Sequence, residues 1–326
     1  MKKLIKVTAV SPANIAFIKF WGKKDPKLNI PFNDTISMNL DSCLTTTTVE
    51  FDEKLKVDQI VIDGHEVTGA KKERVVRILD SVRKIAKFKI FAKVVSKNNF
   101  PSDVGIASSA SGFSALALSA SAAAGLNLSQ KELSILARLG SGSACRSIPD
   151  GFTLWKKGKD NDSSYAVQIA KPDFWGVRDV VTVTSDGKKK VGSTEGHDLA
   201  TTSPYFEARL RNIAGKVKKV KEAILARNFT VFGKLVEEEA VDLHVMAMTS
   251  HPAVFYWNTG TMEVMKKVFE LREKGIECYF TMDAGPNVHV ICLGKNEPKV
   301  KKALGSLSMV HSVISNKVGI GARITK

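Results

Sequence analysis

The sequence has little that marks membrane, disulfide-rich or zinc-binding proteins. No apolar run is long enough to cross a bilayer, and the start MKKLIKVTAVSPAN alternates instead of forming the continuous apolar stretch of a signal peptide. Only 4 cysteines occur, with no CxxC pair: Cys43, Cys145, Cys278 and Cys292. We therefore predict a cytoplasmic protein with reduced thiols, no membrane partner and no zinc site. The sequence does not exclude disulfide bonds between these cysteines, since intracellular proteins of hyperthermophiles sometimes contain disulfides.

Aromatic residues are also sparse, at 7%, and no aromatic-rich RNA-binding motif is present. Apolar residues at 44% and charged residues at 25% are typical of globular proteins. The formal net charge of +16 comes mostly from lysines spread over many segments. Such a spread is more typical of a solvated surface than of a nucleic-acid face, so we predict no nucleic-acid partner and keep RNA binding as a remote alternative.

Periodicity predicts an α+β fold, with strands dominating the first half and helices the second. Strands are expected at 3–9, 14–20, 44–51, 58–64, 89–95, 178–184, 277–282 and 288–293. Helices are expected at 70–87, in the Ala/Ser-rich stretch after 108, from Ser129 with a capping box to Glu132, across 203–273 with breaks near Asn228 and Pro252, and from Pro298. We predict domains at 1–186 and 187–326.

The clearest local motif is PSDVGIASSA at 101–110, where glycine and small hydroxyl residues precede a helix. The free N–H groups and positive dipole of such a helix start favour phosphate binding. It is not a Walker loop, because no Gly-Lys-Ser/Thr follows. Taken alone, the motif is also typical of a plain helix cap.

Three further segments contain residues suited to anion chemistry. GSGSACRS at 140–147 combines glycines with Arg146, whose guanidinium can bind a carboxylate or phosphate through two hydrogen bonds. Taken alone, the segment is more typical of a flexible loop with a surface arginine. Lys19 lies in the apolar run NIAFIKF and needs an anionic partner unless it reaches solvent at a sheet edge. Asp283 in MDAGPN is either a turn former or a rigidly held catalytic carboxylate.

In combination and in this order, the segments resemble those of the diphosphomevalonate decarboxylase family in the GHMP kinase superfamily. The resemblance runs from about residue 8 to about 293 and rests on SPANIAFIKFWGKKD, NNFPSDVGIASSASGFSALA, ARLGSGSACRSIPDGF, KVGSTEGH…TTSPYF and TMDAGPNVHV. It implies an N-terminal half similar to a ribosomal-protein fold, a ferredoxin-like C-terminal half, and an active site in the cleft between them.

The resemblance also implies a reaction. Members of the family use ATP and Mg²⁺ to phosphorylate the 3-hydroxyl of (R)-mevalonate 5-diphosphate. Phosphate and CO₂ then leave, which gives isopentenyl diphosphate and ADP. A homodimer is usual in the family.

Site residues follow from the resemblance by position. Asp283 is expected to face the 3-hydroxyl, Lys19 to neutralise the transferring phosphoryl group, and Arg146 to hold the substrate carboxylate. Expected substrate-binding residues are Asn14, Lys23, Ser141, Ser143 and Ser193. Expected nucleotide-binding residues are Ser96, Asn98, Gly105, Ala107, Ser108 and Ser109, with Ser108 or Ser109 near Mg²⁺.

Some positions depart from the family pattern. Phe20 replaces a usual tyrosine whose hydroxyl touches the substrate diphosphate, which keeps mevalonate 5-phosphate open as an alternative substrate. Asp103, Ile106 and Gly192 also differ from the usual residues. A kinase that phosphorylates the 3-hydroxyl without decarboxylation is a further alternative, although such relatives are expected to lack part of the Asp283, Lys19 and Arg146 set.

Overall fold

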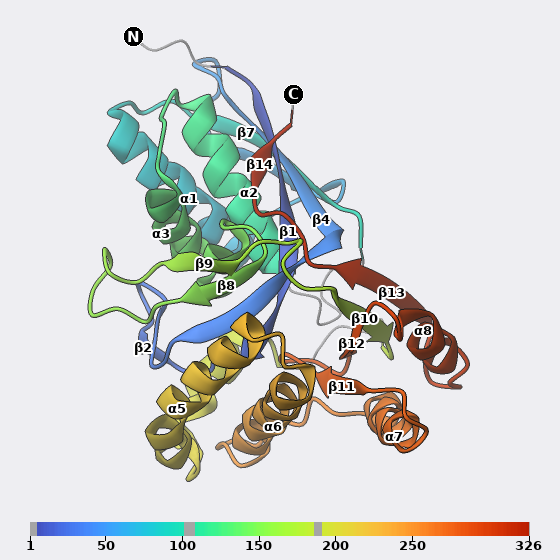
Figure 1. The fold of residues 1–326 in the computed structure, drawn as a ribbon. Helices are drawn as coiled ribbons and strands as arrows, with labels where there is room; N and C mark the ends of the chain where they lie inside the picture. The colour runs from blue at the N-terminus through green and yellow to red at the C-terminus, as the bar shows by residue number, and fades with distance from the viewer. Residues whose placement is uncertain (1–4, 101–107, 186–190, 326) are drawn as a thin grey trace.

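The computed structural model describes residues 5–100, 108–185 and 191–325. Figure 1 shows a large sheet with helices on one side and, at its lower end, a smaller sheet with its own helices. The α+β prediction is confirmed. None of the described helices is long and apolar enough to cross a membrane.

The large sheet is built around two long antiparallel strands, β1 (Val7–Ile18) and β4 (Thr35–Phe51). The remaining described strands of this sheet are β5 (Gln59–Ile62), β6 (His65–Glu66), β7 (Ala92–Asn98), β8 (Phe152–Trp155), β9 (Ala166–Ala170) and β14 (Arg323–Ile324). The strand order is β14-β1-β4-β7-β5-β6. In addition, β8 pairs with β4, and β9 pairs with β8. A short hairpin of β2 (Lys23–Asp25) and β3 (Ile30–Pro31) lies apart from it.

The prediction of separate strands at 3–9 and 14–20 is wrong, because β1 is one strand. An irregularity in register between Pro12 and Asn14 lets both of its parts pair with β4. The segment 44–51 is likewise only the second part of β4. The first part was missed because it buries the polar side chains of Thr35, Ser37 and Asn39, which break the apolar run.

Helices α1 (Gly69–Ala86), α2 (Ser108–Ala123) and α3 (Gln130–Gly140) cover one face of the large sheet (Figure 1). Their apolar side chains share one core with those of β4, β5 and β7. The small residues of α2 allow close packing on β1 and β4. The predicted capping box is confirmed, since Ser129 and Glu132 bond reciprocally at the start of α3.

The smaller sheet has the order β11 (Cys278–Thr281), β12 (Val288–Leu293), β10 (Val177–Val183), β13 (Ser312–Lys317). Helices α7 (Thr259–Glu273) and α8 (Glu297–Gly305) share a core with one of its faces. Helices α5 (Phe206–Leu225) and α6 (Phe229–Met248) share another core with β1, β4 and the smaller sheet. That second core joins the two sheets.

The chain crosses between the sheets more than once. β10 pairs with β12 and β13, and β14 returns from the C-terminal end to pair with β1, as in Ala9↔Ile324. The boundary at residues 186 and 187 lies outside the described residues, so the domain ranges 1–186 and 187–326 stay predictions.

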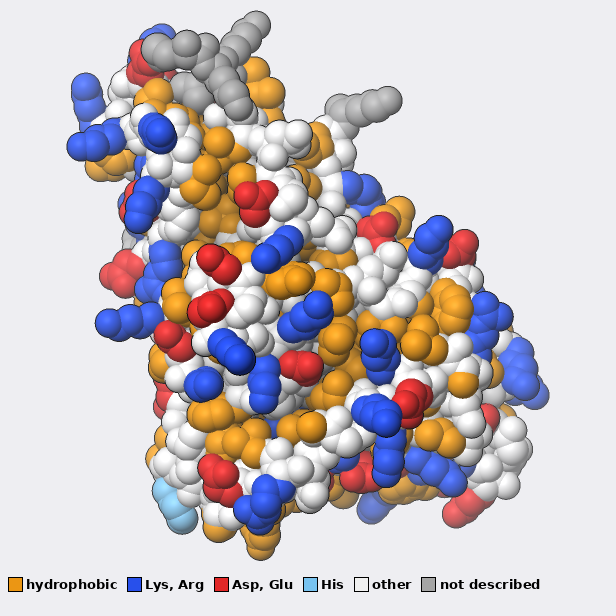
Figure 2. Space-filling view, turned by 60° about the vertical axis from the view of Figure 1, so that its left-hand side comes forward, with side chains coloured by type: hydrophobic (Ala, Val, Ile, Leu, Met, Phe, Trp, Pro, Cys, Tyr) orange, Lys and Arg blue, Asp and Glu red, His pale blue; other side chains and the backbone are white. Residues whose placement is uncertain are grey.

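On the face shown in Figure 2, basic side chains are spread out and do not form one stripe. Figure 2 shows lysine and arginine across the whole visible face, with acidic and apolar side chains between them. The 4 cysteines are all free and buried. Burial raises the pKa of Cys43 and of Cys145 to about 12, so these thiols stay protonated and unreactive near neutral pH.

Candidate active site

Two adjoining cavities contain most of the predicted site residues that the structure describes. The larger, of about 700 Å³, is lined among others by Lys19, Lys23, Ser108, Ser109, Ser141, Ser143, Arg146, Ser193 and Asp283. The second, of about 550 Å³, is lined by Ser96 and Asn98 and shares Ser108 and Ser109 with the first. Gly105 and Ala107, like Asp103 and Ile106, lie outside the described residues.

Lys19 and Asp283 form an ion pair at the floor of the larger cavity. Lys19 follows the end of β1, and Asp283 follows β11, so the pair joins the two sheets. Lys19 Nζ lies 2.8 Å from Asp283 Oδ1 and donates to the Ala16 carbonyl at 2.6 Å. The Lys19 side chain is 1% exposed and that of Asp283 is 25% exposed. Lys19 therefore does not reach solvent at a sheet edge.

The charge state of the pair follows from burial and mutual attraction. Burial would raise the pKa of Asp283, but the Lys19 ammonium outweighs it and, with His289 and Arg146, holds that pKa below its usual range. Burial lowers the pKa of Lys19, against the attraction of Asp283 and Glu239. Asp283 is thus an ionised carboxylate that faces a cavity.

Arg146 is a buried cation held by neutral groups. Its Nε and Nη2 donate to Asn14 Oδ1 at 3.1 and 3.0 Å, and its Nη1 donates to Thr35 Oγ1 at 2.9 Å. Asn14 is fixed in turn by donating to Ser147 Oγ at 2.8 Å. No ion pair joins Arg146 to a described carboxylate, although the charge of Asp283 acts on its guanidinium from further away, so Arg146 can still pair with an anion in the cavity.

The local structure around Arg146 corrects one sequence interpretation. Residues Gly142–Ser147 form a 3₁₀ helix, η1, and Arg146 is 2% exposed, so the alternative of a loop with a surface arginine is wrong. The glycine at 142 has a steric cause, because an added Cβ would lie 2.5 Å from the Phe20 ring.

Serine hydroxyls connect the start of α2 to η1. Ser109 Oγ lies 3.2 Å from Ser141 Oγ, which lies 3.5 Å from Ser143 Oγ. Ser108 and Ser109 line both cavities, so a ligand that spans the two cavities would pass these hydroxyls.

Ser96 and Asn98 lie on β7 at the second cavity. Ser96 Oγ lies 2.9 Å from Thr47 Oγ1. Asn98 donates from its main chain and its side chain to the carboxylate of Asp63, each at 2.8 Å, and accepts from Thr45 Oγ1 at 2.6 Å. The Asn98 side chain is therefore already bonded within the protein.

The opposite wall of the larger cavity is the short helix α4 (Ser193–Leu199), with Ser193 exposed at its first position. Lys23 Nζ lies 3.3 Å from Asp198 Oδ1. His197, which sequence reasoning did not single out, accepts from the Gly22 N–H at its Nδ1 at 3.1 Å, and its ring centroid lies 4.0 Å from that of Phe20.

The surroundings of His197 determine its charge state and which ring nitrogen carries the proton. Burial, with the charges of Lys23 and Arg146, lowers its pKa to about 3. The ring is neutral near pH 7, and because Nδ1 accepts, the proton lies on Nε2. His197 thus adds a neutral ring donor to a cavity wall that includes Lys23.

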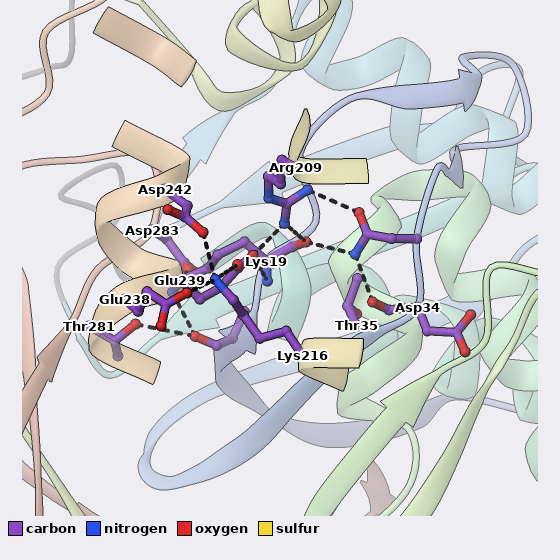
Figure 3. Close-up of polar contacts among 12 residues, drawn as sticks. Lys19, Asp34, Thr35, Arg209, Lys216, Glu238, Glu239, Asp242, Thr281 and Asp283 are labelled. Atoms are coloured by element: carbon purple, nitrogen blue, oxygen red, sulfur yellow. Dashed lines mark hydrogen bonds and ion pairs between the residues drawn. The ribbon is translucent and has the colours of Figure 1, made fainter. Parts of the chain in front are cut away.

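Sequence reasoning also missed a buried charge network behind Lys19. It consists of Arg209 on α5, Glu239 on α6 and Lys216 on α5 (Figure 3). Glu239 belongs to the run Glu237–Glu238–Glu239, which reads as a solvated face. The signal that could have identified it is its helical spacing with Phe232, Val236 and Leu243, which are all buried.

The oxygen groups of the cavity suit Mg²⁺ bound together with phosphates. The described residues contain no cluster of three or more His, Cys, Asp or Glu side chains that could hold a metal alone. Mg²⁺ usually takes only one or two protein oxygens and completes its shell with water and substrate phosphates. The hydroxyls of Ser108 and Ser109 and the carboxylate of Asp283 line one cavity and fit that pattern.

Comparisons with known proteins agree along the whole length of the chain. Residues 11–166 match the diphosphomevalonate decarboxylase-like N-terminal domain, and residues 179–321 match the mevalonate 5-diphosphate decarboxylase C-terminal domain. The chain is similar to the diphosphomevalonate decarboxylase of Schizosaccharomyces pombe, with 35% identity over 98% of this chain and 85% of that protein.

Solved structures show the same similarity in three dimensions. Mevalonate diphosphate decarboxylase from Staphylococcus aureus has a TM-score of 0.94 and 37% identity, and the match covers 98% of each chain. MDDEF in complex with MVAPP, AMPPCP and magnesium has a TM-score of 0.93 and 37% identity over 99% of each chain. Both domain profiles, the full-length identity and the shared fold show that this chain belongs to the diphosphomevalonate decarboxylase family of the GHMP kinase superfamily.

Proposed function

We propose that the larger cavity binds (R)-mevalonate 5-diphosphate and the second cavity binds ATP, and that the chain converts them to isopentenyl diphosphate, ADP, phosphate and CO₂. The observation that carries this assignment is the Lys19–Asp283 pair in the same cavity as Arg146, whose hydrogen bonds go to neutral side chains. The relative solved with MVAPP, AMPPCP and magnesium supports the same ligands here.

Asp283 acts on the 3-hydroxyl. A tertiary hydroxyl is a poor leaving group, so the reaction first converts it into a phosphate. Because Lys19 keeps Asp283 ionised, the carboxylate can accept the hydroxyl proton or orient that hydroxyl for attack. Lys19 Nζ, next to the same carboxylate, neutralises charge on the transferring phosphoryl group.

Arg146 holds the substrate carboxylate. Asn14 and Thr35 bind its guanidinium, and no described carboxylate forms an ion pair with it, so an anion in the cavity can do so. Loss of the 3-phosphate leaves positive charge at C3, and the carboxylate held there releases CO₂ as its electron pair forms the new double bond. Orientation of the carboxylate relative to C3 is therefore the contribution of Arg146.

Serine and lysine side chains bind the phosphates. Ser108 and Ser109 at the start of α2 serve the nucleotide, with Ser96 and Asn98 further along the second cavity. Lys23, Ser141, Ser143 and Ser193 serve the substrate diphosphate side. Ser108 or Ser109 would hold Mg²⁺ together with the phosphates, and the bound ion would neutralise phosphate charge. A cytoplasmic location and a homodimer stay predictions.

One observation favours the 5-monophosphate as an alternative substrate. Phe20 packs against Trp155 and His197 and offers no hydroxyl to a terminal phosphate. The test is ADP formation with (R)-mevalonate 5-diphosphate and, in parallel, the 5-monophosphate, with released CO₂ measured in both. Preference for the diphosphate with one CO₂ per ADP supports the proposal. Preference for the monophosphate changes the substrate, and ADP with a stable 3-phosphate product refutes decarboxylation.

A further inference from the structure

Lys19 lies just beyond β1, and side chains from elsewhere bind its main chain. Its N–H donates to Glu239 Oε1 at 3.2 Å. Its carbonyl accepts from Arg209 Nη2 at 3.1 Å and from Asn33 Nδ2 at 3.2 Å. Figure 3 shows this arrangement, with Lys19 between Arg209 and Glu239. Both polar groups of the Lys19 backbone are thus fixed by side chains.

The groups that bind Lys19 are themselves held by charge. Arg209 donates to Glu239 Oε1, and Lys216 Nζ lies 3.3 Å from Glu239 Oε2. Glu239 is 0% exposed and the Arg209 side chain is 4% exposed. A carboxylate buried to this degree is tolerated only because cations and N–H groups satisfy it. The network is therefore rigid, since any displacement would leave a buried charge unsatisfied.

The same helix also lies near the partner of Lys19. The charge of Asp283 raises the pKa of His244 on α6, against the larger opposing effect of burial, so the two side chains lie near one another. Leu243, which lies between Glu239 and His244 on α6, lines the larger cavity. Helix α6 therefore binds Lys19 through Glu239 and lies near Asp283 through His244.

We propose that Glu239 and Arg209 are positioning residues for catalysis, which hold the Lys19 backbone so that Nζ stays against the Asp283 carboxylate. This proposal rests on the proposed function, in which Lys19 and Asp283 act on the 3-hydroxyl. Neither Glu239 nor Arg209 lines the larger cavity, so both act through Lys19. A misplacement of about 1 Å in a reacting group can lower the rate on the order of 10²-fold.

The test is a double-mutant cycle of Glu239→Gln with Lys19→Met. Glutamine keeps an oxygen for the Lys19 N–H but loses the charge that fixes Arg209. We expect Glu239→Gln to lower kcat on the order of 10²-fold, with KM for (R)-mevalonate 5-diphosphate changed less than about threefold. In the Lys19→Met background the same change should have no further effect, because its target is gone. A full additional loss in that background refutes the proposal, as does a wild-type kcat in Glu239→Gln.

Glu238→Gln is the matched control. Glu238 is on the same helix and pairs with Lys216 at 2.9 Å, but it does not contact Lys19. Its kcat should stay within about twofold of wild type. If Glu239→Gln fails to fold, Arg209→Lys replaces it in the cycle, because lysine keeps the charge near Glu239 but cannot hold both the Glu239 carboxylate and the Lys19 carbonyl.

A second readout is independent of turnover. The Asp283 carboxyl is followed by ¹³C NMR of aspartate-labelled protein, with Asp283→Asn to assign the signal. Loss of the negative charge of Glu239 would by itself lower the pKa of Asp283. A Lys19 ammonium that moves away from Asp283 would instead raise that pKa. Lys19, Arg146 and His289, which lower the pKa of Asp283 in the wild type, all remain in the variant. We expect a rise in Glu239→Gln, and a fall or no change refutes positioning. An inactive wild-type enzyme would overturn the proposed function alone, while this titration still decides the positioning role.

Discussion

Lys19 and Asp283 are 264 residues apart in the sequence, yet Lys19 Nζ lies 2.8 Å from Asp283 Oδ1. Lys19 directly follows β1 of the large sheet, and Asp283 lies two residues beyond the end of β11 in the smaller sheet. The ion pair forms only when the two sheets are docked through their shared core. The proposed catalytic pair therefore depends on the docking of the two sheets.

The first prediction concerns the carboxylate of this pair. Asp283→Asn should lower kcat by several orders of magnitude, because an amide cannot accept the proton of the 3-hydroxyl. The change also removes the carboxylate that pairs with the 1%-exposed Lys19, so we expect some loss of stability, and turnover is compared under conditions in which the variant is folded. Steady-state ADP release measures the first effect and urea unfolding measures the second. Turnover close to wild type would remove Asp283 from the chemical step.

The second prediction concerns the geometry of Arg146. Arg146→Lys keeps the charge but loses the planar guanidinium, which donates to Asn14 and Thr35 at the same time. We expect kcat/KM to fall roughly 10- to 150-fold, the equivalent of one lost charge-assisted hydrogen bond, with KM raised and kcat lowered. Thr35→Val is the graded control, because it removes only the acceptor of Nη1. Unchanged kcat and KM in Arg146→Lys would exclude a role in carboxylate binding.

Local sequence patterns predicted those elements whose cause is local. The capping box at Ser129, the helix break at Asn228 and the strands on each side of Asp283 all follow from short-range signals. β8, β9, β13 and β14 were not predicted. β14 is two residues long and depends on pairing with β1, at Ala9↔Ile324, which no short-range pattern encodes.

The site was predicted by resemblance more than by residue chemistry. Lys19, Arg146 and Asp283 each had a structural interpretation at least as good as a functional one when taken alone, and only their joint order indicated a site. Glu239 and Arg209 were missed because a charged residue on a helix usually faces solvent. Their burial depends on the packing of α5 and α6 against the end of β1, which is a tertiary property.

The third prediction concerns stability at low pH. His244 is 1% exposed, and burial lowers its pKa to about 3, helped by the charge of Lys19. Below the ordinary histidine pKa the unfolded chain binds a proton that the folded chain does not, so stability falls as the pH drops from about 6.5 toward 3. This contribution is about 1.4 kcal/mol per pH unit. Urea unfolding of wild type and His244→Gln at several pH values between 5 and 7 should show a shallower pH dependence for the variant, and equal slopes would contradict the buried neutral histidine.

The last prediction concerns discrimination at the diphosphate end of the cavity. Phe20 packs on Trp155, with ring centroids 4.8 Å apart, and lines the larger cavity. Phe20→Tyr adds a donor there, and one hydrogen bond to a phosphate oxygen is worth about 1.5–3 kcal/mol at most, less the cost of ordering the hydroxyl. We expect KM for (R)-mevalonate 5-diphosphate to fall several-fold, with kcat unchanged, because the contact is made equally in the ground and transition states. KM for the 5-monophosphate should stay the same. Phe20→Leu, which adds no donor, is the control for packing against His197. An equal fall in KM for both substrates would show that the added hydroxyl does not reach the terminal phosphate.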